Sequence, residues 1–232
     1  MPKKKIVVIS GAGISAESGL ATFRGSDGLW EGYDIQEVAS PLGWENNPER
    51  VLEFYNKRRK QAAEAQPNKA HKALAVLEDH FEVLIVTQNV DDLHERAGST
   101  NVLHLHGELK KARSEKDESL VIDIGSDPIK LGDTAEDGAQ LRPHVVWFGE
   151  MVPMIEVAAE EIAKADILVV VGTSLVVYPA ASLVEYAPPK IPKYIIDPEE
   201  PQLFNKKEWV HYKEKAGTGI SKLAEKLKKE IN

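Results

Sequence analysis

Four short runs rich in valine and isoleucine constrain the fold of this chain more than any other feature. They are KIVVIS (5–10), FEVLIVT (81–87), ILVVVG (167–172) and KYIIDP (193–198). Runs of this length and composition are typical of strands that are buried on both faces, as in a parallel sheet. NVLHLHG (101–107) predicts one further strand.

Helical patterns separate these runs. The segments are NNPERVLEFYNKRRKQAAEA, NKAHKALAVLED, MIEVAAEEIAKAD and TGISKLAEKLKKEI. The first begins with an asparagine that can cap a helix and a proline that suits a first helical turn, and the others carry an apolar stripe at helical spacing. The alternation of strands and helices predicts an α/β fold with a doubly wound, Rossmann-like parallel sheet.

Two segments interrupt this alternation. Residues 20–66 form a long excursion after the first strand, and residues 108–144 are polar and weakly patterned. We expect both to form a smaller lobe inserted beside the sheet, so that residues 1–232 make one domain with a lobe built from two chain excursions.

Composition excludes several classes of function. The chain has 232 residues, a net charge of −8 and no cysteine. The negative charge argues against a general binder of nucleic acid or anionic membranes. The lack of cysteine excludes disulfides, a thiolate nucleophile and cysteine-ligated zinc. Because the apolar run after the initial lysines is too short for a secretory signal, and no segment reaches membrane-spanning length, we expect a cytoplasmic protein, and a monomer.

The first stretch that could carry chemistry is SGAGISAESGLATFRGSDGLW (10–30). Gly11 and Gly13 allow a tight turn after a strand, and a helix starting near Ser15 would direct N–H groups at a phosphate. The dinucleotide-binding pattern is met in its looser form, because Ala16 stands where the third glycine would be. Arg24, in the following FRG, could reach a diphosphate. A purely structural glycine turn is the alternative.

Polar groups also follow two other predicted strands. Gln88, Asn89 and Asp91 come after the second run, and the small residues Gly172, Thr173 and Ser174 end the third. The carboxyl edge of an open α/β sheet is where ligands bind. A helix cap explains one polar residue after a strand, but it explains three in four positions less well.

Two further stretches leave alternatives open. In HLHGEL, His104 and His106 lie two apart, and we place His106, next to Gly107, in a cleft. No H-E-x-x-H or comparable ligand set is present, so we expect no metal. In RPHVVWFGE, residues 145–147 are either an edge strand that binds an extended peptide or an ordinary strand.

Tyr55 and Arg58 lie three residues apart in the first predicted helix, so their side chains share one face. The pair could bind either a neighbouring part of the protein or the end of a substrate, and the spacing alone does not decide. The adjacent Lys57 and Arg59 are expected to be surface charges.

Taken together and in order, GAGIS, FRG, QNVD, HLHGEL, VVWFGE and GTSLVVYPAA resemble the sirtuins, which are NAD-dependent protein-lysine deacylases. The resemblance covers nearly the whole chain. Each motif is weak by itself, but six in the same order and spacing are very specific.

The resemblance implies a set of site residues. It implies that NAD contacts Gly11, Ala12, Gly13, Ser15, Glu17, Phe23, Arg24, Trp30, Gln88, Asn89, Val90, Asp91, Gly172, Thr173, Ser174, Asp197 and Ala216. It implies catalytic roles for Asn89, Asp91 and His106, with His106 as general base on a ribose hydroxyl. It implies that an acyl-lysine of a protein substrate contacts Ala39, Tyr55, Arg58, Val145, Val146, Trp147, Phe148, Gly149 and Tyr178.

The Y-x-x-R pair resembles the branch of sirtuins that removes succinyl, malonyl or glutaryl groups. In that branch the phenol and the guanidinium bind the distal carboxylate, and a small residue at Ala39 leaves room for a longer acyl chain. Such a charge-assisted contact contributes roughly 1.5–3 kcal/mol. The alternative is that Arg58 pairs with Glu53 or with solvent.

The chain departs from the sirtuin pattern in two places. Most sirtuins bind a structural zinc through four cysteines, whereas here Ser114 stands near the first position and TAEDG (134–138) replaces a later pair. We therefore expect no zinc and a small lobe held by packing and loop contacts. Asp197 stands where many relatives have asparagine, and its carboxylate can still accept hydrogen bonds from ribose hydroxyls.

Three other functions remain open at this stage. A plain NAD-dependent deacetylase would leave Tyr55 and Arg58 without a role in specificity. A protein ADP-ribosyltransferase would be recognised by its modified protein product. A catalytically inactive NAD-binding module is disfavoured because it would not need His106 together with Asn89 and Asp91.

Overall fold

Six parallel strands form the main sheet of the computed structural model, which describes residues 3–22, 29–30, 32–200 and 206–230. The strands are β1 (Lys5–Ser10), β4 (Glu82–Thr87), β5 (Val102–His104), β9 (Ile167–Val171), β10 (Lys193–Ile196) and β11 (Trp209–Tyr212), in the order β11-β10-β9-β1-β4-β5. All five predicted strands are present, and β5 is shorter than expected. The sequence analysis missed β11, because this edge strand is only partly buried and lacks a continuous apolar run.

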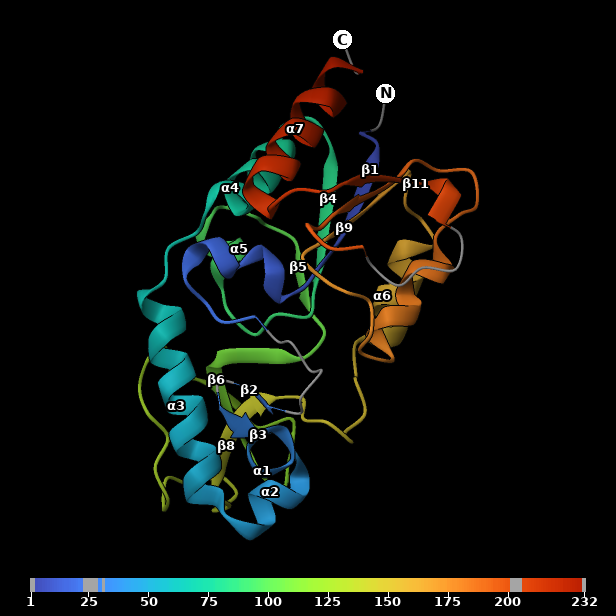
Figure 1. The fold of residues 1–232 in the computed structure, drawn as a ribbon. Helices are drawn as coiled ribbons and strands as arrows, with labels where there is room; N and C mark the ends of the chain where they lie inside the picture. The colour runs from blue at the N-terminus through green and yellow to red at the C-terminus, as the bar shows by residue number, and fades with distance from the viewer. Residues whose placement is uncertain (1–2, 23–28, 31, 201–205, 231–232) are drawn as a thin grey trace.

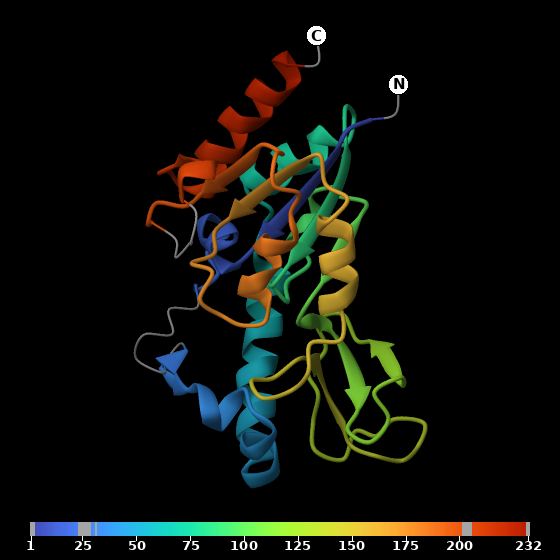
Figure 2. The ribbon, with the colours of Figure 1, turned by 90° about the vertical axis from the view of Figure 1, so that its right-hand side faces the viewer.

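Helices cover both faces of the sheet (Figures 1 and 2). On one face lie α4 (Lys69–Leu77) and α7 (Ala216–Lys229), and on the other lie α6 (Ile155–Ile162) and the 3-10 segment η3 (Ala180–Tyr186). Alternate residues of β1 enter the two cores, with Val8 packed in the first and Val7 in the second. The predicted doubly wound α/β fold is confirmed.

A second group of elements lies beyond the carboxyl edge of the main sheet, in the lower half of Figure 1. From the first excursion come β2 (Leu29–Trp30), β3 (Tyr33–Asp34), α1 (Ile35–Val38), α2 (Pro41–Asn46) and α3 (Pro48–Glu64). From the second come β6 (Gly107–Ser114), β7 (Val121–Asp123) and β8 (Leu141–Val145), which form a small sheet in the order β7-β6-β8. That these two excursions form one smaller lobe, with the bounds 20–66 and 108–144, stays a prediction.

The long helix α3 packs one face against the small sheet. Its buried residues Val51, Phe54 and Tyr55 share a core with Leu109 of β6 and with Trp147. As predicted, Asn47 caps the helix, accepting a hydrogen bond from the Arg50 N–H, and Pro48 opens it. This packing fixes the orientation of α3 about its axis and thereby decides which of its side chains face away from the small sheet.

The predicted helix starting near Ser15 is wrong. Two 3-10 turns are found there instead, η1 (Ala12–Ile14) and η2 (Ala16–Ser18). The physical reason is that Gly11 and Gly13 donate backbone hydrogen bonds to Val171 O and Gly172 O, at 3.0 and 2.8 Å, which bind this loop to the neighbouring strand end. A short helix after β4 was also missed, α5 (Leu93–Arg96). Within the described residues, no helix combines the length and apolarity needed to cross a membrane.

Candidate active site

The predicted motifs meet at the carboxyl edge of the main sheet. Ser10 pairs in register with Thr87 on one side and Val171 on the other, and Val171 pairs with Ile196. The residues that follow these strand ends therefore emerge side by side at one edge, which is where ligands bind in this class of fold.

A cavity of about 1200 Å³ lies at this edge and extends to α3 and the segment after β8. Every predicted site residue within the described part of the chain lines it. These are Gly11, Ala12, Gly13, Ser15, Glu17, Trp30, Ala39, Tyr55, Arg58, Gln88, Asn89, Val90, Asp91, His106, Val145, Val146, Trp147, Phe148, Gly149, Gly172, Thr173, Ser174, Tyr178, Asp197 and Ala216. The predicted residues Phe23 and Arg24 lie outside the described residues.

Glycines allow the loops after β1 and β9 to touch. A Cβ on Gly13 would lie 2.7 Å from Gly172 Cα, and a Cβ on Gly172 would lie 2.3 Å from the nitrogen of Ile14. Gly172 also has a φ of +62°, in the left-handed region. The sequence analysis expected Gly11 and Gly13 to allow a tight turn, and the structure shows that Gly13 and Gly172 also allow close contact between two loops of the protein.

Asn89 and Asp91 are joined through Ser15. The Ser15 hydroxyl donates to Asp91 Oδ2 at 3.1 Å and accepts from Asn89 Nδ2 at 3.2 Å. All three residues are buried, and burial raises the pKa of Asp91 despite the hydrogen bonds that Leu93 N and Ser15 donate to it. The amide and the carboxylate are thus held in a fixed relation at the wall of the cavity.

His106 is held in one tautomer. Its Nδ1 lies 3.0 Å from the carbonyl oxygen of Gln88, and because a carbonyl can only accept, Nδ1 carries the proton. Burial lowers the pKa of His106, so the ring is neutral at pH 7 and Nε2 keeps its lone pair. A neutral imidazole with a free nitrogen is suited to act as a general base.

Two predicted cofactor residues also have structural partners. The Glu17 carboxylate accepts a hydrogen bond at 2.7 Å from Gly217 N, in the first turn of α7, next to Ala216. Asp197 accepts one at 2.9 Å from Glu199 N. Both side chains therefore organise the cavity wall as well as facing it.

Tyr55 and Arg58 line the cavity from α3. Tyr55 is 1 % exposed, with its ring centroid 5.0 Å from that of Phe54 and 6.5 Å from that of Trp147. The Arg58 guanidinium carbon lies 3.9 Å from the centroid of the Trp30 ring. Burial raises the pKa of Tyr55, so its hydroxyl remains a hydrogen-bond donor at neutral pH.

The segment 145–149 is engaged with the rest of the chain. Strand β8 ends at Val145, and the N–H groups of Val146 and Phe148 donate to His106 O and Ala39 O, each at 2.9 Å. Of the strand predicted at 145–147, only Val145 lies in a strand, at the end of β8, which is an edge of the small sheet; pairing of this segment with a peptide stays a prediction.

Sequence reasoning missed an arginine–glutamate pair beneath this segment. Arg142 binds Glu150 through both terminal nitrogens, at 2.7 and 3.2 Å, and Glu150 accepts from Trp147 N at 2.8 Å. Glu150 also lines the cavity. An arginine and a glutamate that flank an apolar segment eight residues apart were the only signal in the sequence.

Arg59 corrects another expectation, because it is not a surface charge. It is 1 % exposed and donates to Leu109 O and to Asn56 Oδ1, both at 2.6 Å. Its neighbour Lys57 is exposed, as expected.

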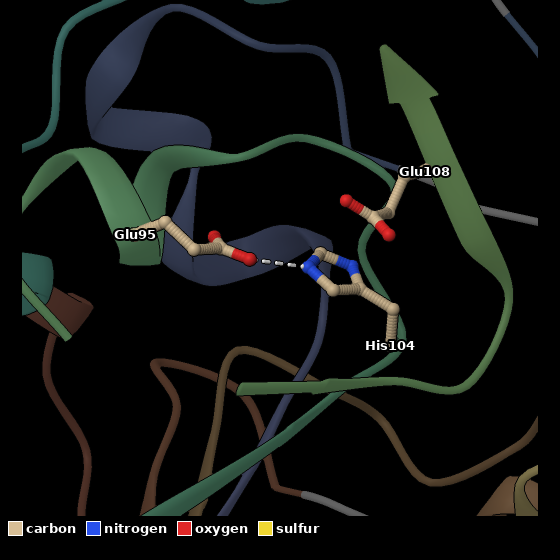
Figure 3. A group of neighbouring side chains, drawn as sticks. All are labelled: Glu95, His104 and Glu108. Atoms are coloured by element: carbon tan, nitrogen blue, oxygen red, sulfur yellow. Dashed lines mark hydrogen bonds and ion pairs between the residues drawn. The ribbon is translucent and has the colours of Figure 1, made fainter. Parts of the chain in front are cut away.

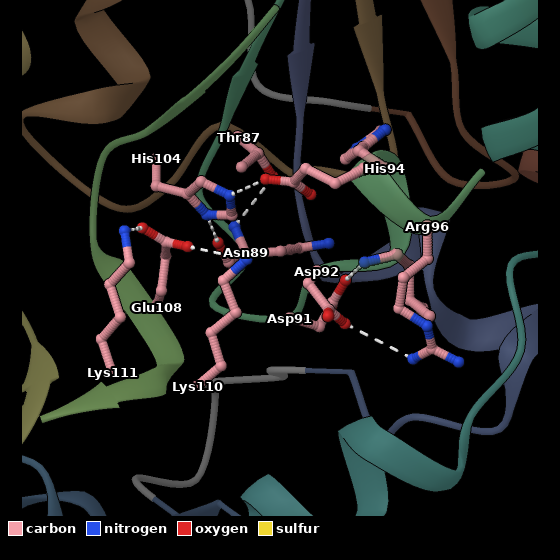
Figure 4. A network of polar contacts seen from close by, with 12 residues as sticks. Thr87, Asn89, Asp91, Asp92, His94, Arg96, His104, Glu108, Lys110 and Lys111 are labelled. Atoms are coloured by element: carbon pink, nitrogen blue, oxygen red, sulfur yellow. Dashed lines mark hydrogen bonds and ion pairs between the residues drawn. The ribbon is translucent and has the colours of Figure 1, made fainter. Parts of the chain in front are cut away.

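One group of side chains resembles a metal site in its spacing. Glu95, His104 and Glu108 have possible ligand atoms within 4.8 Å of one another (Figure 3). Both ring nitrogens of His104 already lie against oxygen acceptors, at 3.1 Å from Asn89 O and 2.7 Å from Glu95 Oε1. Glu108 forms ion pairs with Lys110 and Lys111 (Figure 4). We therefore interpret this group as an ion-pair cluster.

Comparisons with known proteins agree with this geometry. The model of the Sir2 family matches residues 11–179. The NAD-dependent protein deacylase of Helicobacter pylori strain 26695 is 60% identical over 196 residues, which cover 84% of this chain and 85% of that protein. The protein of the same name from Bacteroides thetaiotaomicron is 51% identical over 201 residues, covering 84% and 86%.

Solved structures share the fold. A Sir2 homologue in complex with NAD is 40% identical, with a TM-score of 0.87, and the match covers 99% of this chain and 91% of that one. A Sir2 protein bound to an acetylated peptide is 26% identical, with a TM-score of 0.77, and the match covers 97% and 93%.

Proposed function

Because the chain is an NAD-dependent protein deacylase of the Sir2 family, we propose that it acts preferentially on lysine side chains carrying acidic acyl groups, namely succinyl, malonyl and glutaryl. The observation that carries this proposal is that Tyr55 and Arg58 line the same cavity as His106 and Asn89. A phenol and a guanidinium at the end of an acyl site provide donors for a carboxylate.

The cavity fits a dinucleotide together with an acyl-lysine. Its volume of about 1200 Å³ exceeds the roughly 300–1,000 Å³ of ordinary small-ligand sites. The glycine turn at residues 11–13 and the small residues 172–174 would bind NAD at the strand ends, with Asp197 and Ala216 at the side of the cavity near α7. NAD supplies an activated ribose carbon that accepts the acyl oxygen as nicotinamide leaves.

The residues around this ribose carbon would have different roles. Asn89 and Asp91, locked to each other by Ser15, would orient the nicotinamide end. His106 would take a proton from a ribose hydroxyl at Nε2, while its Nδ1–H stays bound to Gln88 O. Tyr55, Ala39 and Trp147 are almost completely buried, so they would exclude water from the acyl chain.

At the far end of the acyl chain, Arg58 would bind the carboxylate with its guanidinium group. Trp30 supports the guanidinium from one side at 3.9 Å, which restricts its orientation. The hydroxyl of Tyr55 adds a neutral donor. Contacts of this kind contribute roughly 1.5–3 kcal/mol, which corresponds to about one to two powers of ten in preference over acetyl.

The test is nicotinamide release with matched acetyl-lysine and succinyl-lysine peptides, for the unaltered protein and for Arg58→Met. We expect faster turnover of the succinyl peptide by the unaltered protein. Arg58→Met should lower kcat/KM for that peptide about 10- to 100-fold, with little change for acetyl-lysine. Lys57→Met, which removes a charge from an exposed position on the same helix, is the matched control.

Two outcomes would contradict parts of the proposal. Equal losses on both peptides would mean that Arg58 supports the fold rather than selecting the acyl group. Preference of the unaltered protein for acetyl-lysine would leave a plain deacetylase, and an ADP-ribosylated protein as the product would indicate a transferase.

A further inference from the structure

Three successive carbonyl oxygens of the loop after β4 accept hydrogen bonds from one segment of the chain. Gln88 O faces His106 Nδ1 at 3.0 Å, Asn89 O faces His104 Nδ1 at 3.1 Å, and Val90 O accepts from Leu109 N at 2.8 Å. The segment 104–109 therefore holds the backbone that carries Asn89 and Asp91. Of the two histidines, only His106 has a role in the mechanism described above.

The second nitrogen of His104 is also engaged. Its Nε2 lies 2.7 Å from Glu95 Oε1, on α5 (Figure 3). A carbonyl oxygen and an ionised carboxylate both only accept, so each nitrogen of the ring must carry a proton. His104 is then an imidazolium that connects the Asn89 carbonyl to α5. This differs from His106, which is bonded at one nitrogen and is neutral.

The charges around His104 favour this protonated form. The side chain is 9% exposed. The groups that face it are Glu95 from α5 (Figure 3), Glu108 from β6 with its partners Lys110 and Lys111, and, at longer range, Asp91 and His94 (Figure 4). Burial disfavours the charged ring, but the hydrogen bond and charge of Glu95 prevail and raise the pKa of His104 above its ordinary value.

We propose that His104 is a positioning residue of this deacylase, whose proton at Nδ1, retained while the ring is charged, keeps the loop bearing Asn89 and Asp91 in place for cleavage of NAD. The inference rests on the proposed roles of Asn89 and Asp91. When the ring becomes neutral, its remaining proton stays at Nε2 on the stronger acceptor, the Glu95 carboxylate, so Nδ1 is left with a lone pair that faces Asn89 O and no longer binds it. The competent loop would then be less populated, and turnover would fall.

The proposal gives the pH profile two limbs of opposite origin. His106 must be neutral to act as a base, so activity falls toward acid as that ring gains a proton. His104 must be charged, so activity falls toward alkaline pH as that ring loses one. The alkaline limb follows the pKa of His104 and therefore depends on the charge of Glu95, which touches no atom of His106 in the described contacts.

The experiment measures kcat/KM for NAD against pH, together with the NMR titration of the His104 ring, in the unaltered protein and in Glu95→Gln. Glutamine keeps an acceptor for Nε2–H but removes the charge. We expect the ring pKa and the alkaline limb to move together to lower pH, by about one unit or more. Asp92→Asn is the matched control, because Asp92 is a carboxylate of the same turn that pairs with Arg96, and it should leave the limb in place.

Two further variants separate the two ends of the ring. His104→Asn places an amide donor where Nδ1 was and should retain turnover without an alkaline limb. His104→Gln places its amide where Nε2 was, so it reaches Glu95 but not Asn89 O, and should lower kcat/KM for NAD about tenfold or more across the pH range. A merely structural histidine would give the same loss in both variants and no change in the shape of the profile.

Failure of the inference can be told from failure of the proposed function. If the ring pKa falls in Glu95→Gln while the alkaline limb stays, or if the ring titrates below its ordinary range, the inference is overturned. If the unaltered protein turns over no peptide at any pH, the proposed function fails. In that case the dissociation constant of NAD replaces kcat/KM as the measured quantity. Its pH dependence must show the same alkaline limb, and Glu95→Gln must move that limb to lower pH.

Discussion

At the scale of single residues, one helix serves two purposes through side chains that are adjacent in sequence. Tyr55 and Arg58 of α3 face the cavity, whereas Asn56 and Arg59 contact the polypeptide that follows β5. The Asn56 side chain exchanges two hydrogen bonds with the backbone of Ile129, at 2.8 and 2.9 Å. Because a turn of helix takes 3.6 residues, a shift of one position changes the direction of a side chain by about 100°.

Arg59 should therefore matter more for stability than its charge suggests. Replacing it by methionine leaves Leu109 O without its donor and removes the contact with Asn56, so we expect a loss of about 1–3 kcal/mol in the free energy of unfolding. Urea unfolding measures this, with Lys60→Met as the exposed control on the same helix. Equal stability of the two variants would refute a supporting role for Arg59.

At the scale of elements, a hydrogen bond between Ser114 and Asp137 joins two loops of the small sheet. In most sirtuins the matching stretches carry zinc-binding cysteines. Ser114, which is completely buried at the end of β6, donates to Asp137 Oδ2 at 2.7 Å and accepts from the N–H groups of Lys116 and Asp117. Asp137 in turn accepts from Ala139 N at 3.0 Å. The hydrogen bond from Ser114 lowers the pKa of Asp137, which keeps this carboxylate ionised as an acceptor.

We expect Ser114→Ala to destabilise the small sheet, because two N–H groups and a carboxylate lose their partner at once. The expected cost is about 1–3 kcal/mol, seen as lower thermal stability and as faster amide exchange in β6 and β8. Ser119→Ala, which alters an exposed hydroxyl bonded to Asp117, is the control. Since the chain has no cysteine, a chelator should change neither variant; loss of stability on chelation would show a metal contribution to this sheet.

At the scale of the whole molecule, two buried histidines join the main sheet to the helices around it. The rings of His71 on α4 and His94 on α5 lie 4.9 Å apart, and His94 Nε2 is 3.0 Å from the hydroxyl of Ser10 at the end of β1. Burial lowers the pKa of His71 to about 4 and that of His94 to about 3. Both rings are thus neutral in the folded protein over the ordinary pH range.

Stability should consequently fall as the pH is lowered from about 6.5 toward 4. In the unfolded chain these histidines bind protons near pH 6.5, whereas the folded state resists protonation, so acid favours unfolding. His106 and His144 have lowered pKa values and act in the same direction, while His104, with a raised pKa, acts in the opposite one. Urea unfolding at pH 7, 6 and 5 tests the sum. A free energy of unfolding that is constant or rises toward pH 5 would contradict it.

Local patterns in the sequence were sufficient for the strand framework and for most of the cavity. A strand buried on both faces requires a continuous apolar run, and in a parallel sheet every such run ends at the same edge. The sequence alone therefore predicts that the residues following Ser10, Thr87 and Val171 lie together at one edge of the sheet. The order of six motifs then indicated the family, which the comparisons confirm.

Tertiary structure alone decided what each polar group binds. Three examples are the burial of Arg59, the connection of Asn89 to Asp91 through Ser15, and the pairing of Arg142 with Glu150. The periodicity of apolar residues in the sequence does not predict any of these contacts. The two histidines of HLHGEL look alike in the sequence, yet burial lowers the pKa of His106 whereas the Glu95 carboxylate raises that of His104. Periodicity reports which side of an element is buried, whereas hydrogen-bond partners and protonation depend on which distant residue lies opposite.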